Sequence, residues 1–83
     1  MKLKKNCWYF VKKINERPNY FNSDGEMDHL MDGNHKIKYL GFTQMYQGTT
    51  LYYFYDPISN NDWYLKMEDL ETLKPKLINI LNR

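Results

Sequence analysis

The stretch that decides the fold is Lys36–Tyr55, which reads KIKYLGFTQMYQGTTLYYFY. Its two ends are rich in aromatic and β-branched residues, which favour strands. Between them lies Gln47-Gly48, and a glycine at this place can adopt the positive φ that a tight turn requires. We therefore predict a β-hairpin with strands at 36–46 and 51–55.

The chain on either side of this hairpin extends it into a sheet. Asp56-Pro57 ends the second arm, and a polar loop then leads into a short apolar segment, Trp63–Met67. Consecutive strands of this kind form an antiparallel meander. Upstream, the run CWYFV favours another strand at about 6–14, which Arg17-Pro18-Asn19 ends because proline lacks an amide donor.

An early segment carries the signals of a short helix. It begins with a capping box, Ser23-x-x-Glu26, and ends at Gly33, which can form a left-handed cap. Apolar residues at helical spacing lie between these ends: Met27, Leu30 and Met31. The pattern predicts a helix at about 24–32, with His29 on its exposed side.

The C-terminal segment carries a second helix signal. Its apolar residues at helical spacing are Leu70, Leu73, Leu77 and Ile80 or Leu81. Pro75 is tolerated only in the first turn of a helix, so we place Thr72 at the N-cap and the helix at about 73–82. Its apolar stripe is long enough to cover one face of a small sheet.

These elements give one α+β domain over residues 1–83, in the order β-α-β-β-β-α. The expected architecture is a small antiparallel sheet, made of the three-stranded meander and the N-terminal strand. The C-terminal helix packs on one face of this sheet. A chain of 83 residues has room for one hydrophobic core, and its stability is expected to be thin unless a partner binds it.

Composition places the chain among folded domains of the cytoplasm. Aromatic residues make up 17% of it, which excludes the aromatic-poor composition of disordered chains. Cys7 is the single cysteine and no apolar N-terminal run resembles a signal peptide or membrane span, so we expect a reducing compartment and no membrane. The absence of alanine and the ten Lys against two Arg track AT-rich codons. This usage points to a low-GC bacterium, or to one of its phages or mobile elements.

Charge is distributed unevenly along the chain, although the net charge is only +2. Residues 1–17 hold six basic residues and one acidic residue, whereas residues 18–35 hold four acidic residues and no Lys or Arg. The acidic residues are Asp24, Glu26, Asp28 and Asp32. They either neutralise the N-terminal lysines within the fold or act as a decoy for a basic groove of a partner.

The aromatic residues are the main functional signal. In the strand 51–55, Leu51, Tyr53 and Tyr55 share one face and Tyr52 and Phe54 share the other, because alternate residues face opposite sides. Two small helices cannot cover both faces, so we expect an exposed aromatic patch that binds a protein. The residues expected to contact that partner are Trp8, Phe10, Tyr52, Phe54, Trp63, Asp24, Glu26, Asp28 and Asp32.

Two alternatives to protein binding remain open. Aromatic rings beside cations also stack the bases of single-stranded nucleic acid. The residues of this alternative are Lys4, Lys5, Lys12 and Lys13 with Trp8 and Phe10, and Tyr52 as a further platform. The modest net charge and the lack of an RNP-like motif speak against it. The aromatics can also be purely structural, filling the core of a small sheet.

No catalytic, metal-binding or cofactor-binding constellation is predicted. Cys7, His29 and His35 are the only soft or imidazole ligands, and none lies in a CxxC or HxxxH spacing. A calcium-loop register starting at Asp28 fails because Tyr39 stands where the essential glutamate belongs. No GxSxG motif or phosphate-binding glycine loop is present, so we expect a protein that is not an enzyme.

The sequence thus favours a non-catalytic accessory protein that docks its aromatic sheet face on a larger protein. The expected partner is a nucleic-acid-processing or defence protein, with the chain acting as its inhibitor or subunit. Nucleic acid is then contacted directly or through the partner. A homodimer formed by pairing a sheet edge is a third arrangement.

Overall fold

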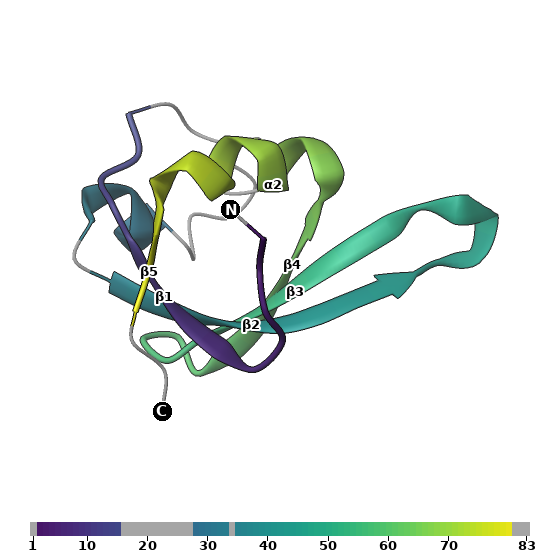
Figure 1. Cartoon of the computed structure of the whole chain (residues 1–83), viewed down its shortest axis with the longest axis horizontal. Helices are drawn as coiled ribbons and strands as arrows, with labels where there is room; N and C mark the ends of the chain where they lie inside the picture. The colour runs from purple at the N-terminus through teal and green to yellow at the C-terminus, as the bar shows by residue number, and fades with distance from the viewer. Residues whose placement is uncertain (1, 16–27, 34, 81–83) are drawn as a thin grey trace.

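The computed structural model describes residues 2–15, 28–33 and 35–80 of the chain. The strands in these ranges are β1 (Cys7–Val11), β2 (His35–Gln44), β3 (Thr50–Asp56), β4 (Asn61–Lys66) and β5 (Leu77–Asn79). The α-helix is α2 (Met67–Leu73), and 3₁₀ helices lie at Asp28–Asp32, Tyr46–Gly48 and Lys74–Lys76. Figure 1 shows the strands curving together beneath α2, with the β2–β3 hairpin extending to one side.

The strands form one antiparallel sheet in the order β4-β3-β2-β1-β5. The predicted α+β class is confirmed, as are the meander β2-β3-β4, the N-terminal strand beside it and the helix on one face. β1 is shorter than the predicted strand at 6–14 and runs from Cys7 to Val11.

The hairpin turns at Gln47-Gly48, as the glycine in the sequence predicted. Gly48 has a φ of 83° and Gln47 a φ of 77°, so both turn residues are left-handed. The Gly48 amide donates to the Met45 carbonyl over 3.0 Å. Because glycine adopts this conformation at little cost, Gly48 explains why the chain reverses here.

A bulge divides β2 into two parts. Tyr39 pairs with Phe54 and Gly41 pairs with Tyr53, so Leu40 has no partner on β3. Gly41 has a φ of 118°, a conformation that side chains other than glycine rarely adopt. β1 pairs with the first part of β2 only, from His35 to Tyr39. The hairpin beyond the bulge therefore extends away from β1, as Figure 1 shows.

The C-terminal helix lies earlier than predicted, and a strand replaces the predicted helix at 73–82. Pro75 cannot donate the amide hydrogen bond that a continued helix needs, so α2 ends at Leu73 and a 3₁₀ helix takes up the proline. The following residues, Leu77–Asn79, pair with β1 as β5. Thr72 is not the N-cap; its hydroxyl donates to the Glu68 carbonyl within α2.

The predicted helix at 24–32 is described only at its end. Residues 24–27 and the capping box lie outside the described residues, and Asp28–Asp32 form a 3₁₀ helix instead of an α-helix. The Gly33 amide donates to the Leu30 carbonyl, three residues before it, over 3.3 Å. Gly33 has the predicted left-handed conformation, with a φ of 80°.

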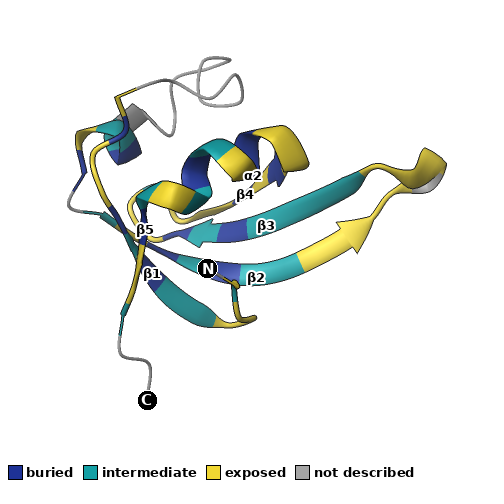
Figure 2. Ribbon diagram, turned by 45° about the horizontal axis from the view of Figure 1, so that its top comes forward, coloured by how far each residue is buried: buried dark blue, intermediate teal, exposed yellow. Residues whose placement is uncertain are grey.

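The hydrophobic core lies between the sheet and α2. It comprises Tyr9, Val11, Ile14, Leu30, Ile37, Tyr39, Phe54, Trp63, Leu65, Leu70, Leu73 and Leu77. Figure 2 shows buried segments on α2 and on the strands beneath it, whereas the end of the β2–β3 hairpin is exposed. Since Leu30 of the 3₁₀ helix and Leu70 of α2 share this core, both elements cover the same face of the sheet.

The core makes a prediction for alkaline pH. Burial raises the pKa of the Tyr39 phenol above its ordinary value of 10.0, and the charges of Tyr52 and Tyr9 raise it further. Folded Tyr39 therefore keeps its proton at a pH where the unfolded chain releases it, so the free energy of unfolding falls as the pH rises past about 10.

Urea unfolding at about pH 8 and about pH 10.5 measures this loss. In Tyr39→Phe the loss should be smaller than in the wild type, because the titrating group is gone. Tyr64→Phe, at a side chain that is 51% exposed, is the matched control. An equal loss in Tyr39→Phe and the wild type would contradict the prediction.

Candidate interaction surfaces

The face of the sheet opposite the core combines aromatic rings with lysines. Antiparallel pairing places side chains opposite each other on one face. Trp8 is opposite Lys38 and Phe10 is opposite Lys36, and Lys38 is in turn opposite Tyr55. We call the following residues the aromatic–lysine face: Trp8, Phe10, Lys36, Lys38, Tyr53, Tyr55 and Tyr64.

The lysines of this face lie against tryptophan. The ammonium group of Lys36 is 5.5 Å from the centre of the Trp8 ring, and that of Lys38 is 6.0 Å away. Tyr55 meets the same ring edge-on at 6.3 Å. These distances fit cation–π contacts, which hold the cations beside the aromatic ring.

This face lies on the side of the sheet away from the described helices. Tyr9 and Val11, which alternate with Trp8 and Phe10 in β1, are in the core with the helix residues Leu30 and Leu70. Tyr64 is 51% exposed, while Trp8, Phe10, Tyr53 and Tyr55 are half-buried. Within the described residues, the face is therefore partly open to solvent.

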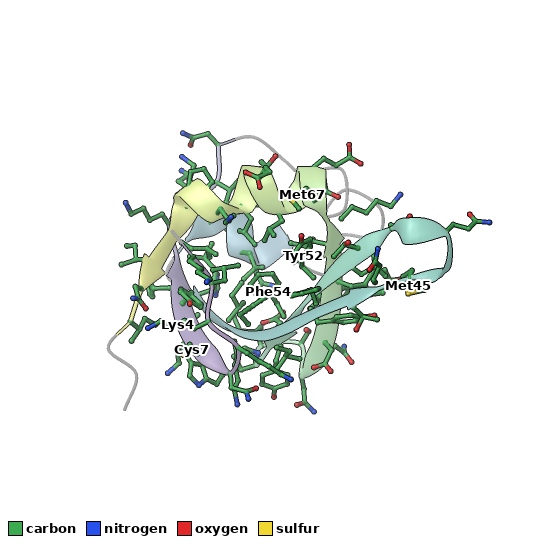
Figure 3. All side chains as sticks on the ribbon, turned by 45° about the vertical axis from the view of Figure 1, so that its right-hand side comes forward. Lys4, Cys7, Met45, Tyr52, Phe54 and Met67 are labelled. Carbon is green, nitrogen blue, oxygen red and sulfur yellow. The ribbon has the colours of Figure 1, made fainter. Side chains whose placement is uncertain are left out.

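A second surface, on the other side of the sheet, is apolar. Phe42 is 66% exposed and Met67 49%. The Phe42 ring lies 6.0 Å from that of Tyr52, whose hydroxyl lies 3.8 Å from the Met67 sulfur. Figure 3 shows Met67 of α2 close to Tyr52, and Met45 at the far end of the hairpin. We call the three connected residues the hairpin patch: Phe42, Tyr52 and Met67.

The structure separates the aromatic residues that the sequence grouped as partner contacts. Trp8 and Phe10 lie on the aromatic–lysine face, and Tyr52 lies at the edge of the core within the hairpin patch. Phe54 and Trp63 are core residues, 1% and 8% exposed. They are removed from the candidate contacts, because this fold does not present their rings to a partner.

The structure adds two cations of β2 to the N-terminal lysines named from the sequence. Lys4, Lys5, Lys12 and Lys13 are exposed. The aliphatic part of Lys5 packs over Gly41, where a β-carbon added to the glycine would lie 3.6 Å from it. The cations that accompany Trp8 are Lys36 and Lys38, which sequence reasoning missed. Their signal was the alternation Lys36-Ile37-Lys38, but only the pairing of β2 with β1 brings it to Trp8.

The predicted acidic contacts are largely untested. Asp24 and Glu26 lie outside the described residues, and Asp28 begins the 3₁₀ helix. Asp32 is exposed. These four residues stay a prediction. A further acidic set lies on α2, which contains Glu68, Asp69 and Glu71 and no basic residue.

A buried carboxylate forms the most polar cluster of the interior. Asp56 is fully buried, and its carboxylate accepts from the Ser59 hydroxyl at 2.8 Å and from the Ile58 amide at 3.1 Å. His29 Nε2 lies 2.9 Å from Asp56 Oδ2, outside the direction of a hydrogen bond. The prediction that His29 points to solvent is wrong, because its side chain is only 22% exposed and packs against Asp56.

The histidines and the cysteine do not assemble a metal site in the described residues. The rings of His29 and His35 lie 5.0 Å apart, edge to face. Cys7 is half-buried and packs against the core, as a small hydrophobic residue does. No group of three His, Cys, Asp or Glu side chains in the described ranges is close enough to hold a metal ion.

Comparison of the chain with family models, curated proteins and solved structures found no match. The two surfaces must therefore be interpreted from their own chemistry. Among residues 2–15, 28–33 and 35–80, no helix has the length and apolar character needed to span a membrane.

Proposed function

We propose that this chain is a non-catalytic accessory protein that docks on a larger protein through the hairpin patch. The observation that supports the proposal is the exposure of large apolar side chains at one place. Phe42 alone is 66% exposed, and Met67, which is 49% exposed, is connected to it through Tyr52. Grouped apolar side chains on a protein surface mark interaction sites, and methionine adapts its shape to a partner.

The acidic residues next to the patch support a partner with a basic surface. Glu68 is exposed and directly follows Met67, and Glu71 is exposed one helical turn after Met67 on the same side of α2. A complementary partner has an apolar recess with a basic rim. Basic grooves are typical of proteins that handle nucleic acid, so the partner proposed is a cytoplasmic nucleic-acid-processing or defence protein. A small phage or mobile-element protein on that groove acts as an inhibitor or a subunit.

Site-specific cross-linking tests this proposal. A photoreactive amino acid at Phe42 or Met67 should cross-link one larger protein in an extract of a low-GC bacterium. The matched control is the same group at Ile58, which is 57% exposed in the turn between β3 and β4 and belongs to neither surface. The cross-linked protein is then purified and titrated with the chain.

In that titration, Phe42→Ser should weaken binding at least tenfold, which is about 1.4 kcal/mol. Its effect on folding should stay within about 0.5 kcal/mol, because the side chain is exposed. Replacing Glu68 and Glu71 together with glutamine should slow association and reduce its salt dependence. The same cross-links from Ile58 as from Phe42, or cross-links to a second copy of the chain only, would overturn the proposal.

A further inference from the structure

The aromatic–lysine face offers a chemistry that the hairpin patch lacks. Trp8 lies with the ammonium groups of Lys36 and Lys38 within 5.5 and 6.0 Å of its ring. Aromatic rings stack nucleobases and lysines pair with phosphates, and together they form the surfaces that bind single-stranded nucleic acid. We propose that this face binds a single strand of DNA or RNA, independently of the protein partner of the hairpin patch.

The order of the strands spaces these groups suitably. β2 lies between β1 and β3, so Trp8 and Tyr55 lie on either side of Lys38. The Trp8 and Tyr55 rings meet edge-on across β2, with their centres 6.3 Å apart and the ammonium groups of Lys36 and Lys38 beside Trp8. Tyr53 and Tyr64, whose ring centres are 6.1 Å apart, continue the aromatic surface to β4. A base stacked on this aromatic surface has lysines nearby to pair with its phosphate.

The charges of the described strands and of α2 favour a polyanion on this face over the surface of α2. Pairing places Lys66 of β4 on the same face as Lys36 and Lys38, and among the paired strand residues of this face one is acidic, Asp62. On the opposite side, α2 carries Glu68, Asp69 and Glu71. A phosphate backbone is therefore attracted to the aromatic–lysine face and repelled by α2.

A duplex fits these features less well than a single strand. In a duplex the faces of the bases are stacked on one another, so the rings of Trp8 and Tyr64 have no base to stack on. Reading a duplex through its major groove requires a helix free to enter it. α2 has seven residues and buries Leu70 and Leu73 in the core, so it is not free to do so.

Fluorescence anisotropy with labelled oligothymidine or oligouridine of about 12 nucleotides tests the proposal. Both oligonucleotides should bind at about 50 mM salt. At about 200 mM salt the affinity should fall roughly sevenfold, which is the loss expected for two phosphate contacts on a single strand. A duplex of the same length should bind more weakly than either strand.

Three variants connect the binding to the face. Trp8→Leu should lower the affinity by about 5- to 150-fold, the range for loss of one stacked base. The double change Lys36→Gln and Lys38→Gln should remove most of the salt dependence, and circular dichroism should show a folded chain. Lys74→Gln, at the end of α2, is the matched control and should bind as the wild type does.

Several outcomes would overturn the proposal. This face is excluded as a single-strand site if the chain does not bind, or if duplex and single strand bind equally. It is also excluded if the Lys36 and Lys38 changes leave the affinity unaltered. If Trp8→Leu unfolds the chain, Tyr64→Ser at the exposed edge replaces it, with a weaker but measurable loss expected. If the cross-linked protein partner contacts Trp8 instead, the face is a protein interface.

Discussion

Phe54→Ala should lower the free energy of unfolding by about 3–5 kcal/mol, the usual loss when a buried phenylalanine is truncated. Phe54 is 1% exposed, and its ring lies 5.2 Å from that of Tyr39. A domain of 83 residues has a total stability of about 4–12 kcal/mol, so the variant should be marginally folded or unfolded. Urea unfolding followed by circular dichroism measures the change.

The matched control is Tyr53→Ala, the neighbouring residue on the opposite face of β3. Its loss should be smaller, because Tyr53 is only half-buried and lies outside the core. The comparison also separates the two roles considered for the aromatics. A folded Phe54→Ala chain that fails to bind a partner would show that Phe54 is a contact residue after all.

Asp56→Ala should be similarly damaging, with a loss of about 3–5 kcal/mol, because it removes one partner of a buried polar cluster. The carboxylate accepts from the Ser59 hydroxyl and the Ile58 amide, and His29 lies against it. Ser59 Oγ in turn accepts from the Trp63 indole at 3.0 Å. Without the carboxylate, partly buried donors of the β3–β4 turn lose their acceptor.

Asp56→Asn is the control for shape. It keeps one side-chain oxygen for the turn and should cost about 1–2 kcal/mol, less than the alanine change. Both losses are measured by urea unfolding at neutral pH. Equal stability of Asp56→Ala and the wild type would show that the cluster does not stabilise the fold.

Local patterns predicted most of the fold. The alternation in β3, the left-handed Gly48 and the breaks at Pro57 and Gly33 are each set by a few adjacent residues, and they gave the meander and its turns. The same reasoning failed after Leu73. Leu77 has helical spacing from Leu73, yet it lies in strand β5 with its side chain in the core. Pro75 ends the helix before it, and the following residues pair with the edge of β1.

The candidate surfaces were predictable only in part. That aromatic rings would exceed what the helices cover followed from composition, and exposed rings are present at Phe42 and Tyr64. Which rings these are did not follow. Trp63 resembles Trp8 in the sequence, as an aromatic residue in a short apolar strand, but it lies in the core and Trp8 lies beside two lysines.

The sequence by itself therefore determined the fold class, the hairpin and the two-faced character of its strands, since these depend on the periodicity and turn chemistry of neighbouring residues. Only the tertiary structure decided which face α2 covers, which lysines meet Trp8 and that His29 meets Asp56. Those contacts join residues far apart in the chain. Their formation depends on strand pairing and on the burial of one face, which no local pattern records.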